Sequence, residues 1–393
     1  MRSLLLVWAA VSALLPSVLL SVALLLAILR ARRRIFVQTR LGPSVHLVRP
    51  LCGREEAADE KNLSLLRQDY GPLTVSFVAE SEHDLGLNDA RRVCEAEGRA
   101  TCLTACDVSA VSGKARNMIA GWRSSTSELV GFCDSDIALS ARDIGNCVSA
   151  LLEARAAAAF APCLFDAPGP WGRLAMHVAT IDKYVLAEAG GALGLVPCME
   201  GGLMLVSRSA LDSAGGIEVI TGTLADDLRI GRVLRAQGFR LGIAAAPVIH
   251  RSKSESARVW GRRYLRWSIC RRTETPWFQL LALALNPVVI PLAVGVMCSS
   301  PQTLALLAFG MVWRIGYSHV VSRLLLAPHG VQMRGWCWAR PVTEILDAVF
   351  IALAFVTRSL IWRDRAYSID FRGRVTRAEP RSPSPPIEHV ARA

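Results

Sequence analysis

The sequence predicts an α/β fold with a mostly parallel sheet, flanked by N-terminal and C-terminal membrane helices. Strand-like apolar runs alternate with helical stretches between residues 44 and 250, which is the pattern of βαβ units. Residues 4–29 are almost wholly Leu, Val and Ala and carry no charge. Two further apolar stretches, 278–298 and 302–326, follow the α/β region and are expected to form a helical hairpin.

Short apolar runs bounded by Gly, Pro or polar residues mark the expected strands, and longer periodic stretches mark the expected helices. Because the two alternate, parallel strand pairing is favoured. The expected strands are 45–49, 73–79, 101–104, 128–133, 159–163, 203–206 and 240–248. The expected helices are 87–97, 115–123, 141–158, 174–188 and 224–237.

The N-terminal segment 1–34 is expected to be a signal-anchor helix, because its apolar run is long enough to cross a bilayer. Four arginines between positions 30 and 34 follow that run directly. A cleaved signal peptide would instead have its basic residues first and a shorter apolar core. By the positive-inside rule, the α/β region after the arginines lies in the cytoplasm.

The chain is basic and apolar, with a formal net charge of +12 and 52% hydrophobic residues. Such a charge suits either nucleic acid or an anionic membrane surface. The arginines lie beside apolar segments, which favours the membrane surface and argues against nucleic acid as a partner. The 11 cysteines contain no C-x-x-C pair. A zinc site is therefore not expected, and a reducing cytosol is favoured over a disulfide scaffold.

A short acidic stretch after the buried strand 128–133 is the main candidate site. Asp134 and Asp136 follow that strand one residue apart. The carboxyl edge of a parallel sheet is where α/β folds bind ligands. Oxygen-only ligands of this kind suit Mg²⁺ or Mn²⁺, which in such sites also hold substrate phosphates. The alternative is an ordinary capped strand-to-helix turn, since Asp and Ser are common there.

Other polar residues follow neighbouring strands or begin helices. The second strand ends in Glu80, Glu82 and Asp84. Asp226 and Asp227 lie together at an expected helix start. One Asp there would be a normal cap, but two adjacent aspartates are more than a cap needs.

The segment 251–275 combines arginines with the aromatic residues Trp260, Tyr264 and Trp267. On a helix, Arg263 and Trp267 share one face, with Arg266 beside them. Arginine suits phosphate because its planar fork is always charged and bidentate. An interfacial basic helix with a tryptophan belt has the same composition, and both interpretations can hold together.

The C-terminal part is expected to contain one more membrane-associated segment and a tail. Residues 342–362 have a short apolar centre with charges around it, and we expect them to be interfacial or re-entrant. If they spanned the membrane, the basic residues 363–377 would lie outside, against the positive-inside rule. Residues 378–393 are rich in proline and are expected to be disordered. The predicted divisions are 1–34, 44–250, 251–275, 276–365 and 366–393.

These motifs occur in the order seen in ceramide glucosyltransferases, which the chain resembles over about residues 44–270. The residues that carry the resemblance are Pro50-Leu51-x-Gly53, Gln68-Asp69-Tyr70, the acidic run 80–84, Asp134-Ser135-Asp136, Asp226-Asp227 and Arg263-x-x-Arg266-Trp267. Bacterial hopanoid-associated glycosyltransferases look similar too. The resemblance implies a GT-A domain facing the cytosol, a nucleotide-sugar donor, a lipid alcohol acceptor and, for a bacterial member, the inner membrane.

The resemblance also implies roles for individual residues. Lys114 matches a family lysine, although this chain has Ser112-Gly113 where the family often has an asparagine before that lysine. Either Glu82 or Asp84 could be the first acidic site. By resemblance, Pro50, Asp84 and Lys114 bind the donor, and Asp134 and Asp136 bind the metal and diphosphate. Asp227 is the general base by the same resemblance, and Arg263, Arg266 and Trp267 are catalytic residues near the diphosphate and membrane.

The resulting hypothesis is a membrane-bound inverting glycosyltransferase that moves one sugar from a UDP-sugar to ceramide or a hopanoid. A processive polysaccharide synthase shares the aspartates and a Q-x-x-R-W motif, but three or four spans are few for a polymer pore. A non-catalytic lipid-binding or scaffold protein is the other alternative. The presence of all the candidate acids argues against it. The sequence leaves the sugar and the lipid open.

Overall fold

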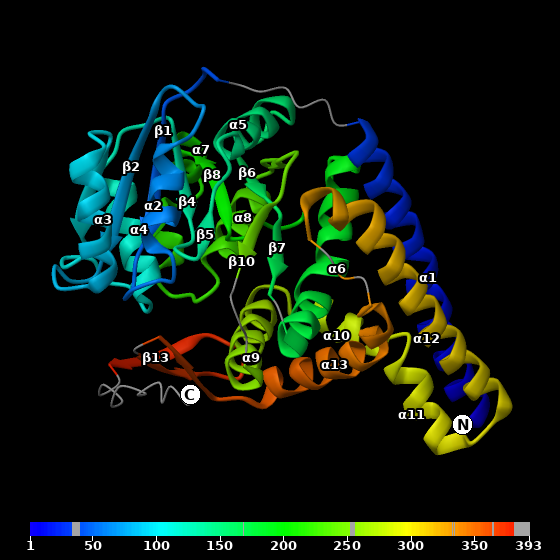
Figure 1. Cartoon of the computed structure of the whole chain (residues 1–393). Helices are drawn as coiled ribbons and strands as arrows, with labels where there is room; N and C mark the ends of the chain where they lie inside the picture. The colour runs from blue at the N-terminus through cyan, green and yellow to red at the C-terminus, as the bar shows by residue number, and fades with distance from the viewer. Residues whose placement is uncertain are drawn as a thin grey trace, which may run out of the picture.

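A computed structural model describes residues 1–33, 40–167, 169–251, 256–331, 333, 335–363 and 365–380, without the side chains of 175–180 and 380. An α/β body lies beside a group of long helices, and the N-terminus is at the far end of that group (Figure 1). The C-terminal strands lie below the body, next to helices α9 and α13.

The body is built on a seven-stranded sheet with the order β3-β2-β1-β4-β8-β6-β9. Strand β1 pairs in parallel with β2 and β4, β2 pairs in parallel with β3, and β6 pairs in parallel with β9. Only β8 is antiparallel to its neighbours among these paired strands, so the predicted mostly parallel sheet is confirmed. The strands are β1 Val45–Pro50, β2 Leu73–Ala79, β3 Ala100–Thr104, β4 Leu129–Cys133, β6 Ala158–Ala161, β8 Leu203–Ser207 and β9 Leu241–Ile243.

Helices cover both faces of this sheet, because the strands are apolar on both sides. On one face, α2 Ala58–Leu66, α3 Leu85–Ala96 and α5 Asp143–Glu153 contribute to one buried apolar cluster. On the other face, α4 Gly113–Arg123, α7 Arg208–Ser213, η1 Ile217–Ile220 and α8 Asp226–Ala236 contribute to a second one. The two cores hold the carboxyl ends of β1, β2 and β4 at one edge.

A small second sheet, β5-β10-β7, lies beside that edge. Its strands are β5 Ile137–Ala138, β7 Cys163–Asp166 and β10 Val248–Arg251. The single strands expected at 159–163 and 240–248 are therefore wrong, because each is divided between the two sheets. Pro162 and Pro247 lie at the two breaks, where a residue without an N–H cannot continue a strand ladder.

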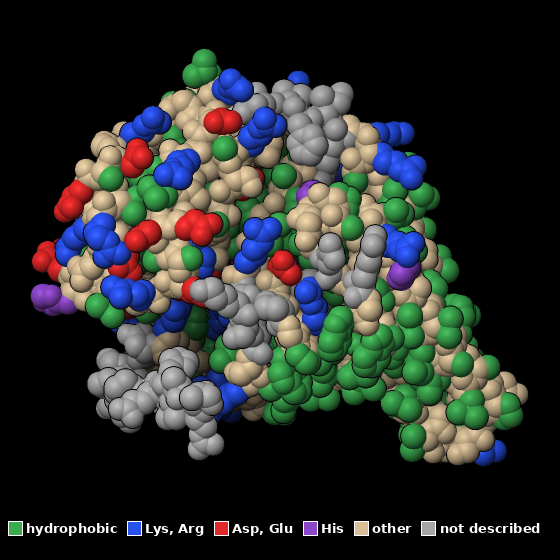
Figure 2. Space-filling model, in the orientation of Figure 1, with side chains coloured by type: hydrophobic (Ala, Val, Ile, Leu, Met, Phe, Trp, Pro, Cys, Tyr) green, Lys and Arg blue, Asp and Glu red, His purple; other side chains and the backbone are tan. Residues whose placement is uncertain are grey.

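Within the described residues, two helices are long and apolar enough to span a bilayer, Arg2–Arg33 (α1) and Pro301–His329. The second comprises α12 Pro301–Val321 and its extensions η2 Ser322–Leu326 and η3 Ala327–His329. Helices α10 Pro276–Ala284 and α11 Val289–Cys298 are bent by 48° and could count as a third span. Exposed hydrophobic side chains on α1, α11 and α12 cover the protruding end in Figure 2.

Helix α6 Gly169–Leu193 connects the body to these membrane helices. It shares a buried apolar cluster with α1, α9 Ala257–Glu274 and α12. At its far side Arg314 of α12 is only 1% exposed and binds Asp182 of α6 at 2.5 Å, and it also binds Glu344 of α13 Arg340–Val356. A buried charge network thus connects three helices.

The C-terminal region differs from the expectation. Helix α13, preceded by η4 Cys337–Ala339, ends at Val356, and a three-stranded antiparallel sheet follows. Its strands are β11 Ser359–Trp362, β12 Arg365–Ile369 and β13 Val375–Pro380. The expected segment 342–362 therefore divides into most of α13 and the strand β11, and the disorder expected from residue 378 is wrong for residues 378–380, which belong to β13. Alternating burial of Leu360, Tyr367 and Ile369 against α9 explains the sheet. The disorder expected for 381–393 lies outside the described residues.

Candidate active site

The two aspartates of the acidic stretch lie in the loop between β4 and β5. The loop is fixed by its backbone, since the Asp134 N–H donates to the Gly202 carbonyl at 3.1 Å. The Asp134 carboxylate contacts Lys114 Nζ at 2.8 Å, and the Asp136 carboxylate contacts His250 Nε2 at 2.9 Å. Each aspartate therefore has its own positively charged or proton-donating partner.

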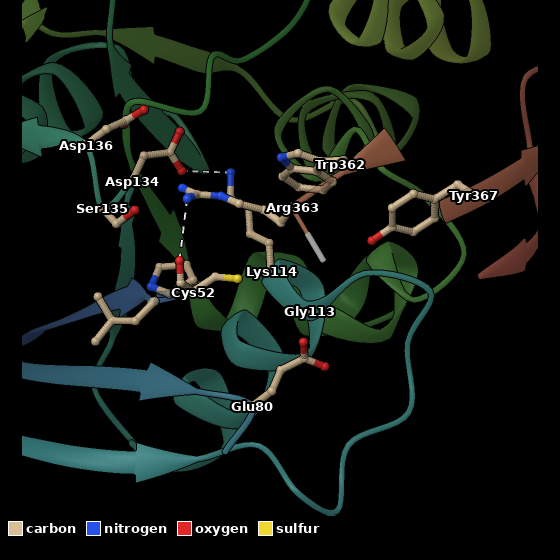
Figure 3. Close-up of a pocket in the computed structure, with 12 residues that line it drawn as sticks. Cys52, Glu80, Gly113, Lys114, Asp134, Ser135, Asp136, Trp362, Arg363 and Tyr367 are labelled. Carbon is tan, nitrogen blue, oxygen red and sulfur yellow. Dashed lines mark hydrogen bonds and ion pairs between the residues drawn. The ribbon is translucent and has the colours of Figure 1, made fainter. Parts of the chain in front are cut away.

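Both aspartates line the same pocket, which is partly open to solvent. The ends of β1 and β2 contribute Pro50 and Glu80, and the start of α4 contributes Lys114. The C-terminal sheet closes the opposite side of the pocket (Figure 3). Segments separated by more than 200 residues thus meet at the carboxyl edge of the sheet.

Lys114 links two acidic groups across the pocket, with Asp134 at 2.8 Å and Asp226 at 3.0 Å. Burial alone would lower the pKa of Lys114, but the surrounding aspartates outweigh it and raise that pKa above its usual range. The local structure explains why this chain has Ser112-Gly113 before Lys114, where the family often has an asparagine. Ser112 caps α4 by accepting from the Ala115 N–H, and a Cβ on Gly113 would lie 2.3 Å from a Glu80 oxygen.

Asp226 and Asp227 begin helix α8. The Asp227 carboxylate accepts from the Leu228 N–H at 2.8 Å. A Cβ on Gly201 would lie 3.2 Å from its other oxygen, so the glycine leaves room beside this acid. Burial, and then the charge of Asp226, raises the pKa of Asp227 to about 6. An acid with that pKa can accept a proton near neutral pH.

The two pocket aspartates differ in their electrostatic surroundings. Burial raises the pKa of Asp134, although Lys114 opposes the rise. For Asp136, burial alone would raise the pKa, but His250 and then Arg263 and Arg363 outweigh it and hold the pKa well below its usual range. Asp136 is therefore ionised at every physiological pH.

The residues expected near the diphosphate lie on α9, behind the pocket. Arg266 stacks over the Trp362 ring at 4.4 Å from its centroid, and Trp362 lines the pocket. Arg263 lies over the Phe165 ring at 5.1 Å. Trp267 meets Phe165 edge-on with ring centroids 6.3 Å apart. Arg266 is thus separated from the pocket by one ring, and Trp267 packs as a support.

Of the acids after β2, Glu80 lines the pocket. Asp84 instead caps α3 by accepting from Gly86 and Leu87, and its second oxygen accepts from the Gly53 N–H at 2.9 Å. Asp84 therefore holds the turn after Pro50 in place. The structure brings Pro50, Lys114, Asp134 and Asp136 together in the lining of one pocket. The other predicted site residues do not line it: Asp84, Asp227, Arg263, Arg266 and Trp267.

Several site residues were missed by the sequence analysis. His250 is stacked on Phe165 with ring centroids 4.3 Å apart and supports Asp136. It is a lone histidine in a strand, which gives no sequence signal by itself. Trp362, Arg363 and Tyr367 reach the pocket only because the C-terminal sheet folds against α9.

The pocket supplies only some of the ligands that a divalent cation needs. The described ranges contain no group of three or more His, Cys, Asp or Glu arranged to hold a metal ion. Asp134 and Asp136 offer two carboxylates on one pocket wall. Mg²⁺ is commonly held by one or two carboxylates together with waters and substrate phosphates. The donor set therefore fits an ion that shares its coordination with a phosphate-bearing ligand.

Comparison with known protein families identifies this arrangement. Residues 8–375 match Glycosyl transferase family 21. The chain belongs to this family. The matched range takes in all the predicted site residues, and it confirms the resemblance to ceramide glucosyltransferases as a family relationship.

Two curated relatives of this family 21 chain come from Caenorhabditis elegans. Ceramide glucosyltransferase 1 is 24% identical over 238 residues, which cover 60% of this chain and 51% of that protein. Ceramide glucosyltransferase 3 is 23% identical over 243 residues, which cover 61% and 53%. The chain thus spans about half the length of the curated relatives it matches.

A solved structure shares the fold of this family 21 chain. The mannosyltransferase PcManGT from Pyrobaculum calidifontis, in complex with GDP-Man and Mn²⁺, superposes with a TM-score of 0.53 at 21% identity. The match covers 88% of this chain and 99% of that chain. The likeness confirms the predicted GT-A type fold.

Proposed function

We propose that this family 21 chain transfers one hexose from a nucleotide diphosphate sugar, a UDP-sugar, to a lipid hydroxyl with inversion at the anomeric carbon. One observation carries the proposal. Asp134, Asp136 and Lys114 line one pocket, and Lys114 binds the neighbour of Asp227. Two carboxylates, a partly buried cation and an acid with a raised pKa are what diphosphate departure and hydroxyl activation require.

The donor diphosphate is assigned to the pocket wall formed by the β4–β5 loop and the start of α4. Asp134 and Asp136 would hold Mg²⁺ or Mn²⁺, which neutralises charge on the leaving diphosphate when bound. Lys114 supplies a fixed positive charge beside Asp134. Arg266, behind the Trp362 ring, adds to the positive potential of this wall.

Asp227 is assigned as the general base. It takes the proton from the acceptor hydroxyl while that oxygen attacks the anomeric carbon. The bond from that carbon to the diphosphate oxygen breaks, and its electron pair leaves with the diphosphate. A single displacement of this kind inverts the configuration. Gly201 has no side chain and so leaves space beside Asp227, where the acceptor hydroxyl would bind.

The acceptor is assigned to the membrane, and we favour ceramide or a hopanoid. Helix α13, which lies against α9, exposes the apolar residues Val342, Ile345, Val349 and Leu353. Their spacing of three and four residues puts them on one face, as in a helix lying in a membrane surface. We place the catalytic body in the cytoplasm at a bacterial inner membrane, where the basic flanks meet anionic lipid.

The curated relatives are named ceramide glucosyltransferases, which supports a sphingolipid-like acceptor. The test is transfer of label from radioactive UDP-glucose, UDP-galactose, UDP-N-acetylglucosamine and GDP-mannose, using membranes with and without the protein. One sugar on a chloroform-extractable lipid is the expected product. A labelled polymer would instead indicate a processive synthase, and absence of any labelled product would indicate a non-catalytic protein.

A further inference from the structure

The C-terminal three-stranded sheet forms one wall of the pocket, although it lies more than 200 residues from the aspartates. Trp362, Arg363 and Tyr367 come from β11, the turn after it and β12, and all three line the same pocket as Asp134 and Asp136. Figure 3 shows Arg363 extending into this pocket toward the carbonyl of Cys52. No other arginine lines it among the residues that the structure describes.

Arg363 has an unusual backbone conformation, and its guanidinium binds the Glu55 side chain. Its backbone has φ of +54°, a left-handed conformation that costs free energy in a residue other than glycine. The guanidinium binds the Glu55 carboxylate at 2.5 Å and the Cys52 carbonyl at 3.4 Å. Its side chain remains 43% exposed. The turn therefore aims a solvent-reachable guanidinium at the pocket.

Glu55 occupies the place of an anion in this arrangement. Its Oε1 accepts from Arg363 and also from the Ser135 hydroxyl at 3.0 Å, and Ser135 lies between the two pocket aspartates. The Glu55 carboxylate thus bridges the loop that carries the two aspartates and Arg363, the only arginine that lines the pocket among the described residues. A phosphate group in its place would make the same contacts. Guanidinium binds carboxylate and phosphate with the same fork geometry.

We propose that Arg363 is a donor-binding residue, which exchanges Glu55 for the diphosphate of a nucleoside diphosphate sugar. The proposal rests on the proposed function. It assigns the C-terminal sheet to the donor site and makes Glu55 a competitor that holds Arg363 ready when the pocket is empty. Arg365 of the same sheet has another task, because it binds Glu80 at 2.8 Å and is only 14% exposed.

The test is binding of UDP and of uridine to the full-length protein in detergent with Mn²⁺, measured by isothermal titration calorimetry. Arg363→Ala should weaken UDP binding about ten- to hundred-fold, the range expected for loss of a charged hydrogen-bonded pair. Uridine binding should not change. Glu55→Gln should tighten UDP binding, because it removes the competing carboxylate. Arg374→Ala is the matched control, since Arg374 belongs to the same C-terminal region, is 62% exposed and binds Asp370.

Three results would overturn the proposal in different ways. If the wild-type protein binds UDP and Arg363→Ala binds it equally well, Arg363 does not contact the donor, while the proposed function stands. If the wild-type protein does not bind UDP, the proposed function fails and the assignment of Arg363 fails with it. If Arg374→Ala weakens UDP binding as much as Arg363→Ala does, the loss of binding reflects the general stability of the C-terminal sheet and not a contact between Arg363 and the donor.

Discussion

Protonation of Asp227 should switch off sugar transfer at a pH that follows from the structure. Burial, and then the neighbouring Asp226, raises the pKa of Asp227 to about 6. A general base works only in its ionised form, which amounts to about nine-tenths of the molecules at pH 7 and about one-tenth at pH 5. The rate should therefore fall about ten-fold below its plateau at pH 5. At high pH it should level off.

The measurement is kcat/KM for the lipid acceptor from pH 5 to pH 8, with donor and metal saturating. Saturation matters because the pKa of Asp134 is also raised by burial, and its protonation would appear as weaker donor binding. Asp226→Asn should move the inflection to lower pH, because it removes a negative charge beside Asp227. Asp227→Asn should abolish turnover and keep donor binding.

The reasoning about Asp227 has two clear points of failure. A rate that stays level down to pH 5 would show that no group with a pKa near 6 is needed in its ionised form. Wild-type turnover by Asp227→Asn would remove this residue as the base, whatever the pH profile.

Three further substitutions test other contacts. His250→Phe removes the bond to Asp136 and should weaken activation by Mn²⁺ about 10- to 100-fold, as loss of a supporting partner does in metal sites. Gly113→Ala puts a Cβ 2.3 Å from a Glu80 carboxylate oxygen and should lower turnover by moving this carboxylate away from Arg116 and Arg365. Arg314→Met removes one of the two arginines that bind Asp182 and Glu344 and leaves Arg340 as their remaining cation. It should cost about 1–3 kcal/mol of stability, seen as a lower thermal midpoint in detergent.

Gly316→Ala serves as a control for the last two, because a Cβ there has no neighbour within 4 Å. It should change neither turnover nor the thermal midpoint. An unchanged Mn²⁺ dependence in His250→Phe would separate His250 from the metal site. Wild-type turnover in Gly113→Ala would show that the position of the Glu80 carboxylate does not matter for turnover. An unchanged midpoint in Arg314→Met would show that Arg314 adds no net stability.

The body of the fold could be predicted because its signals are local. The strand before Asp134 is a continuous apolar run, as expected for a strand buried on both faces, and the acids follow at its end. Because strands and helices alternate along the chain, the strands are expected to be parallel, and their carboxyl ends then lie at the same edge of the sheet. The breaks at Pro162 and Pro247 were missed because each apolar run continues past the proline, so composition alone suggests one strand.

The far wall of the site could not be predicted. Composition predicts a membrane-associated segment over 342–362 and a basic tail over 363–377, yet Leu360 and Tyr367 of this region are buried and pack on α9. That packing depends on a tertiary contact with no local signal. For the same reason Arg363 and His250 escaped notice, since each is defined by a partner distant in the sequence.

The most direct measurement is a cryo-electron microscopy map of the full-length protein with UDP and Mn²⁺ in detergent or nanodiscs. The account predicts density for the diphosphate in the pocket lined by Lys114 and Arg363, with an ion beside Asp134 and Asp136. Nucleotide bound elsewhere, or a pocket that stays empty under saturating UDP, would contradict it.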